Sequence, residues 1–87
     1  MYAQLIDVRA APGGTGELAR AVRCELFVSL RSHPGFCGGL SLFDHDSDAG
    51  LLVLLWETGE QAVNPLPWNR ASTATAATSA FEVDARL

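Results

Sequence analysis

The sequence predicts an α+β fold of the ferredoxin-like kind, with the element order β-α-β-β-α-β and one antiparallel sheet that carries both helices on one face. Segments with the alternation of strands and a segment with helical spacing follow one another in this order. Residues 2–9 and 51–56 are apolar on both faces, as suits the two central strands of such a sheet. The 87 residues make one domain, 1–87.

The first half of the chain predicts a strand followed by a helix. Residues 2–9 (YAQLIDVR) alternate as a strand does, and residues 11–16 (APGGTG) form a turn. Thr15 is the expected N-cap of the helix, and Pro34 with Gly35 ends it. Between these limits apolar residues recur at every fourth position, at Leu18, Val22, Leu26 and Leu30.

A hairpin follows the helix. Residues 40–44 alternate apolar and polar side chains, and residues 51–56 (LLVLLW) form a wholly apolar strand. The segment 44–50 (DHDSDAG) between them is rich in turn formers. A strand with two apolar faces needs cover on both sides, and a domain of this size provides it on one side only. The sequence therefore predicts a homodimer, formed through the open face of the sheet.

The last third of the chain is the least regular part. Thr58 is the expected cap of a short helix at 59–63, and Pro65 and Pro67 interrupt the segment after it. Residues 71–80 (ASTATAATSA) fit either an alanine-rich helix against the sheet or a loose segment, and we favour the helix. Residues 81–87 (FEVDARL) alternate and form the predicted fourth strand.

Composition and charge narrow the classes of partner. A net charge of −4 and a pI near 4.9, with the basic residues spread along the chain, argue against nucleic-acid binding. The longest apolar run, 51–56, is far short of the roughly 20 residues of a membrane span. No secretory leader is expected, and Cys24 and Cys37 lack metal-site spacing. We therefore expect a cytoplasmic protein with reduced thiols and no membrane partner.

Two short motifs carry a resemblance to a known family. The turn at 34–36 (PGF) and the step at 56–62 (WETGEQA) stand on either side of the hairpin with its acidic turn. In the order and spacing of these features the chain resembles the antibiotic biosynthesis monooxygenase family. The resemblance implies a dimeric α/β barrel, in which two ferredoxin-like units pack their sheets face to face. It also implies a small monooxygenase that oxidises a hydrophobic aromatic, polyketide- or quinol-like molecule without cofactor or metal.

The functional residues of this family carry over in part. Trp56 matches the tryptophan that lies in the substrate cavity of the quinone-forming members. Leu52 and Ala62 stand where those members carry an asparagine and a tyrosine. Other members degrade haem and need a histidine on the second helix, but no histidine follows His45 in this chain. Haem is therefore not expected.

The candidate substrate-binding residues are two tryptophans and three polar side chains. Trp56 and Trp68 are the expected walls for a flat aromatic ligand, although each also fits a plain core position. Tyr2, Gln4 and His45 are the candidate polar contacts, and no catalytic residue is assigned.

The acidic turn around His45 is a further candidate, in this case for a metal site. His45 lies within DHDSD (44–48), whose alternating oxygens resemble the start of a calcium loop. The glycine and the final glutamate of that loop are missing, so we predict a solvated turn and no metal site.

Two alternatives to the monooxygenase stay open. One is a non-catalytic dimeric barrel for small-molecule binding or scaffolding, and the other is an isomerase or cyclase on the same fold.

Overall fold

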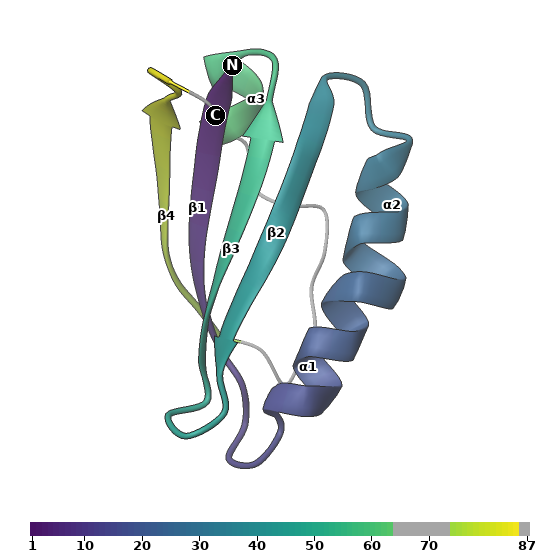
Figure 1. Cartoon of the computed structure of the whole chain (residues 1–87), viewed down its shortest axis with the longest axis vertical. Coiled ribbons are helices and arrows are strands. Elements are labelled where there is room, and N and C mark those ends of the chain that lie inside the picture. Colours follow the sequence, from purple (N-terminus) through teal and green to yellow (C-terminus); the bar gives the residue numbers. More distant parts are fainter. Residues whose placement is uncertain (64–73, 86–87) are drawn as a thin grey trace.

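A computed structural model describes residues 1–63 and 74–85 of the chain (Figure 1). Its strands form one antiparallel sheet in the order β2-β3-β1-β4. They are β1 (Tyr2–Arg9), β2 (Phe36–Asp44), β3 (Ala49–Trp56) and β4 (Ala74–Glu82). The predicted α+β class is confirmed, with β1 and β3 in the middle of the sheet, and the arrangement is compatible with a ferredoxin-like fold.

One long helix lies along a single face of the sheet (Figure 1). It consists of α1 (Thr15–Ala21), the π-helical turn η1 (Val22–Leu26) and α2 (Phe27–Arg31), which follow one another without a break. The apolar residues predicted from the helical spacing are buried and pack on the inner side chains of β1 and β3. This core contains Leu18, Val22, Leu26 and Leu30 from the helix, with Ile6, Val8, Leu52 and Leu54 from the strands.

The second helix of the described chain is short. It is α3 (Gly59–Val63), and the backbone N–H of Gln61 donates to Thr58 Oγ1 over 3.2 Å. This is the predicted cap at its predicted place. Ala62 joins the core on the same face as the long helix. The predictions for residues 64–73, including Trp68, lie outside the described residues.

The lower end of the sheet in Figure 1 is fastened by Asp48, in the turn between β2 and β3. Its carboxylate accepts the Thr15 hydroxyl over 2.7 Å and the backbone N–H of Gly13 over 3.3 Å. Its backbone carbonyl accepts the N–H of Ala10 over 2.9 Å. The prediction of Thr15 as N-cap is therefore wrong. Gly14 occupies the N-cap, because the buried Thr15 hydroxyl is bonded to the turn.

The alanine- and threonine-rich segment is a strand where we predicted a helix. Residues Ala74–Glu82 pair with the whole of β1, from Arg9↔Ala74 to Tyr2↔Glu82. The fourth strand thus begins well before Phe81, and residues 83–85 lie after its end. The physical reason is that β3 pairs with the backbone groups on only one side of β1. With only residues 81–87 on the other side, most of the backbone N–H and C=O groups there would be unpaired.

The other face of the sheet, which we call the open face, is mostly apolar, with Asp7 among its side chains. In register across β2, β3 and β1 it presents Leu42, Leu51 and Asp7 in one row and Leu40, Val53 and Leu5 in the next. No helix of the described chain lies on it (Figure 1). Leu40, Leu42 and Phe81 are each 50% exposed or more. The open face thus leaves a group of apolar side chains in contact with solvent.

Candidate binding site around Trp56

Trp56, at the end of β3, lies inside the core and makes a polar contact there. Its side chain is 4% exposed, and its Nε1–H donates to Gln4 Oε1 over 2.9 Å. Gln4 comes from the neighbouring strand β1 and is 0% exposed. Gln4 pairs with Leu54, two residues before Trp56, so the alternation of strands places both side chains on the helix-covered face. A buried indole N–H needs such an acceptor.

Two more rings pack on the indole of Trp56. The ring of Phe36, the residue paired with Trp56 on β2, lies edge-on with centroids 5.3 Å apart. The imidazole of His33 lies edge-on from the loop after α2, with centroids 5.7 Å apart. Edge-to-face contacts at this separation are attractive and fix the plane of the indole. His33 was not among the predicted site residues, and its place directly before the PGF turn was the available signal.

The two sequence motifs meet at this end of the sheet. The N–H of Glu57 donates to the carbonyl of Gly35 over 2.9 Å, and Gln61 Nε2 donates to the carbonyl of Pro34 over 2.7 Å. Gly35 has a φ of +82°, and a side chain there would overlap the Gln61 amide. The PGF turn and the WETGEQA step thus form one contact, which closes the end of the sheet around Trp56.

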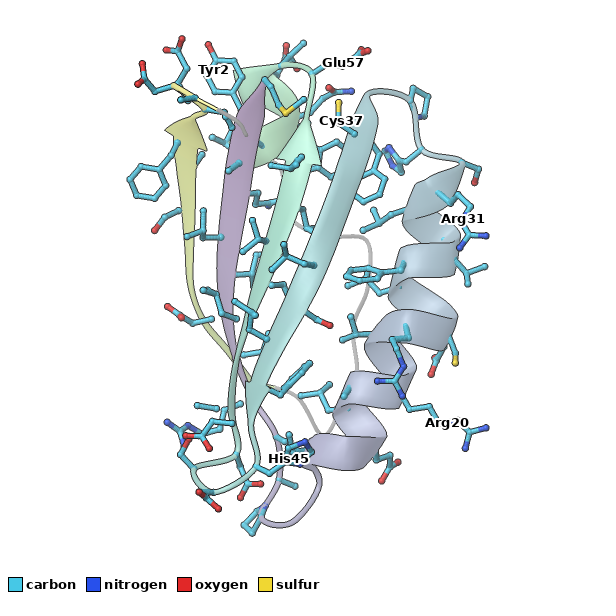
Figure 2. All side chains as sticks on the ribbon, in the orientation of Figure 1. Tyr2, Arg20, Arg31, Cys37, His45 and Glu57 are labelled. Carbon is cyan, nitrogen blue, oxygen red and sulfur yellow. The ribbon has the colours of Figure 1, made fainter. Side chains whose placement is uncertain are left out.

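Tyr2 lies at the same end of the sheet, as Figure 2 shows. It pairs with Trp56 across β1 and β3, and its ring packs closely over Gly59, where an added Cβ would lie 3.3 Å from it. Leu52 and Ala62, the positions of the asparagine and tyrosine in the quinone-forming monooxygenases, are both fully buried. In the described part of the site, these two positions offer no polar group to a ligand.

The structure brings together three of the five predicted site residues. Tyr2, Gln4 and Trp56 lie at one end of the sheet, whereas His45 lies in the β2–β3 turn at the opposite end (Figure 2). The prediction had placed His45 among the polar contacts, but the hairpin separates it from Trp56 by the full length of β3. Trp68 falls outside the described residues.

The acidic turn around His45 is held by its own hydrogen bonds. Asp44 accepts the N–H of Asp46 and the hydroxyl of Ser47, each over 3.0 Å. These bonds, that of the Asp46 N–H foremost, hold the pKa of the Asp44 carboxyl below its ordinary value of 3.8. In the described chain no three His, Cys, Asp or Glu side chains are grouped as metal ligands.

Comparison with known proteins finds no matching family model, curated protein or solved structure. The family membership therefore rests on the two motifs alone and stays a proposal. In the described part of the chain, no helix has the length and apolarity needed to cross a membrane.

Proposed function

We propose that the chain is a self-associating binding protein of the dimeric-barrel type. In this proposal two copies pack their open faces together, and each holds a flat, apolar aromatic molecule beside Trp56. The observation that carries the proposal is the open face, on which Leu40, Leu42 and Phe81 stay at least half exposed. An apolar patch of several hundred Å² on a small soluble protein often marks an interaction site, and a second copy covers it most simply.

The size of the open face supports association of moderate strength. A sheet of this breadth and strand length presents roughly 500 Å² of flat area, or on the order of 1,000 Å² for two copies. That lies near the lower limit for a specific protein–protein interface. We therefore expect a dimer whose formation depends on protein concentration.

The surroundings of Trp56 support binding more than oxidation. Aromatic rings of Phe36, His33 and Tyr2 gather at this end of the sheet, and ligand sites are mostly apolar with a few placed polar groups. The Gln4 carboxamide already accepts the indole N–H. Leu52 and Ala62, fully buried, bring no hydrogen-bonding side chain. A binding function needs no such pair, whereas the oxidation implied by the resemblance does.

The cofactor-independent monooxygenase is the second candidate, and Gln4 favours it. The quinone-forming members use a side-chain amide on the third strand, and this chain has a buried amide on the adjacent β1, in contact with the same tryptophan. In this candidate the substrate displaces the amide from the indole, and the amide N–H donates to a phenolate oxygen. A cytoplasmic location belongs to both candidates and is supported by Cys24 and Cys37, which are exposed and unpaired.

Sedimentation of the wild type over a range of concentrations tests self-association. Val53→Asp places a carboxylate in the middle row of the open face and should abolish the dimer. The matched control is Val28→Asp, since Val28 is 53% exposed on the helix, away from the open face. A wild type that stays monomeric at every concentration contradicts the proposal, as does a Val53→Asp variant that sediments like the wild type.

Binding and oxidation are separated by two measurements on the same protein. Titration with a hydroxynaphthalene-type phenol, followed by fluorescence, reports binding in the wild type and in Trp56→Phe. Oxygen uptake with the same phenol reports the reaction, and Gln4→Met should abolish uptake if the amide takes part. Binding without oxygen uptake favours the binding protein, and the absence of both contradicts a small-molecule site at Trp56.

A further inference from the structure

We infer that the π-helical turn η1 is a one-residue insertion in an otherwise regular α-helix, and that it keeps one face of the long helix on the sheet. The backbone hydrogen bonds show the change of helix type. The N–H of Val22 donates to the carbonyl of Leu18, four residues back, whereas the N–H of Phe27 donates to the carbonyl of Val22, five residues back. The turn thus holds one residue more than an α-helical turn.

The apolar residues of this helix have a spacing that suits a continuous α-helix poorly. They are four residues apart, at Leu18, Val22, Leu26 and Leu30. In an α-helix four residues turn about 400°, so each step moves the side chain about 40° around the axis. At about 120° apart, Leu18 and Leu30 would lie at opposite margins of an apolar stripe that is roughly 100° wide. They are instead 5% and 0% exposed, as buried as the residues between them.

The π turn removes most of this displacement. Its hydrogen bonds join residues five apart, which corresponds to about 4.4 residues per turn. Four residues then turn about 330°, so the step from Val22 to Leu26 runs about 30° in the opposite sense to the step before it. The angle between Leu18 and Leu30 falls to about 50°, and the four side chains lie within one stripe.

Phe27 provides an independent check, because it is not part of the four-residue spacing. In a continuous α-helix it would lie about 180° from Leu18, on the side that faces away from the sheet. With the π turn this angle is about 110°. Phe27 is half-buried and packs against the core, whereas the next residue, Val28, is 53% exposed. The burial of Phe27 therefore agrees with the rotation that the extra residue produces.

The rotation of the last helical turn also positions His33 at the Trp56 end of the sheet. The N–H of His33 donates to the carbonyl of Leu30 over 2.9 Å, and the His33 ring packs edge-on on Trp56. Without the π turn Leu30 would be rotated by about 70°, and the loop bonded to it would move as well. The π turn is thus a positioning element for the contact between His33 and Trp56.

The extra residue can be removed without loss from the core. Cys24 lies in the middle of η1 and is exposed. Without it the spacing of the four apolar residues becomes four, three and four, as in a regular amphipathic α-helix. The shortened chain can then form a continuous α-helix with the same buried face. Its length changes by at most about 1.5 Å, the rise of one residue.

Deletion of Cys24 and insertion of an alanine directly after Cys24 test the inference. The deletion variant should unfold cooperatively in urea with a midpoint at or above that of the wild type, because a regular α-helix replaces a rare π turn. The insertion lengthens the middle step to five residues and turns Leu30 roughly 100° away from the sheet. It should therefore lower the midpoint, although it alters the chain length at the same exposed site.

Phe27→Asp and Val28→Asp test the rotation in the intact helix. With the π turn, an aspartate at position 27 lies against the core and should lower the urea midpoint. An aspartate at position 28 lies in solvent and should leave the midpoint unchanged. In a continuous α-helix both positions would face solvent, so the two variants would unfold alike.

The outcomes are distinct from those that test the proposed function. A deletion variant with a lower midpoint than the wild type overturns the one-residue insertion. A Phe27→Asp variant as stable as Val28→Asp overturns the π register itself. Both results leave the proposed function standing, because Cys24 is exposed on the helix, on the other side of the sheet from the open face. A wild type that stays monomeric and binds no phenol overturns the proposed function alone.

Discussion

Replacement of Gln4 and Trp56, singly and together, measures how much the buried hydrogen bond between these two side chains stabilises the fold. The Nε1–H of Trp56 is buried and its acceptor is Gln4 Oε1, 2.9 Å away. Gln4→Met keeps the length of the side chain and removes the acceptor, so the indole N–H is left unpaired in the core. An unsatisfied buried donor costs about 1–3 kcal/mol. For a domain of this size about 2 kcal/mol lowers Tm by roughly 8–16 °C.

Trp56→Phe removes the donor instead and leaves Oε1 without the indole. It also leaves unfilled volume beside Phe36 and His33, whose rings pack on the indole edge-on. We expect a loss of about 2–4 kcal/mol from the two effects. The double variant removes both hydrogen-bonding partners. Since neither group is then left unpaired by the other, it should cost about 1–2 kcal/mol less than the sum of the single losses.

The assay is urea unfolding of the four proteins at one protein concentration, followed by far-ultraviolet circular dichroism, with the coupling energy taken from the double-mutant cycle. A coupling of about 1 kcal/mol or more shows that the bond holds the native core together. Additivity within about 0.5 kcal/mol refutes the reasoning. It would show that the indole N–H finds an acceptor other than Gln4 in the variant.

Three further predictions concern the two ends of the sheet. Asp48→Ala should lower the free energy of unfolding by about 3 kcal/mol, because it removes the acceptor of Thr15 and Gly13 and puts alanine at a φ of +58°. Asp48→Gly has no such backbone strain and should lose about 1 kcal/mol less. Equal losses in the two variants would contradict this explanation. Gly35→Ala should cost about 2–3 kcal/mol through its positive φ and the displaced Gln61 bond, measured against Gly16→Ala, where an added Cβ meets no atom within 4 Å. Asp44 has a lowered pKa in the fold, so its contribution to stability is present above about pH 3.8 and is lost as the pH falls below that value. Asp44→Asn should therefore flatten this part of the curve of urea midpoint against pH. An unchanged slope would exclude a contribution of Asp44 to acid stability.

Local pattern was enough for the parts of the fold in which one face is buried. The strand predicted at residues 2–9 has those limits in the structure, and every apolar residue of the helical spacing is buried. The segment 71–80 misled because alanine favours a helix in isolation. What decided its structure was the second edge of β1, whose backbone groups need a strand along their whole length. This need for a pairing strand arises in β1, far away in the sequence, and it cannot be seen in the residues of 71–80 themselves.

The candidate site divides in the same way. The alternation of the first strand puts Tyr2 and Gln4 on one face, and the family resemblance points to Trp56. The register that brings the three residues together is given by the structure. The role of Asp48 could not be predicted, since its partners Thr15 and Gly13 lie more than 30 residues away along the chain. His45 attracted interest for its acidic neighbours, which serve the turn itself: Asp44 accepts hydrogen bonds from within the turn. The polar composition of a short segment does not show at which end of the sheet the segment lies.

The contact between the two motifs changes what the family resemblance can support. The PGF turn and the WETGEQA step are joined by the bonds from Glu57 to Gly35 and from Gln61 to Pro34. The positive φ of Gly35 and the Gln61 amide beside it make glycine necessary for this packing, whatever the protein does. The motifs therefore have a sufficient explanation in how the end of the sheet closes. Their joint presence supports the architecture, and the reaction must be argued from Leu52, Ala62 and Gln4, where this chain and the oxygenases differ.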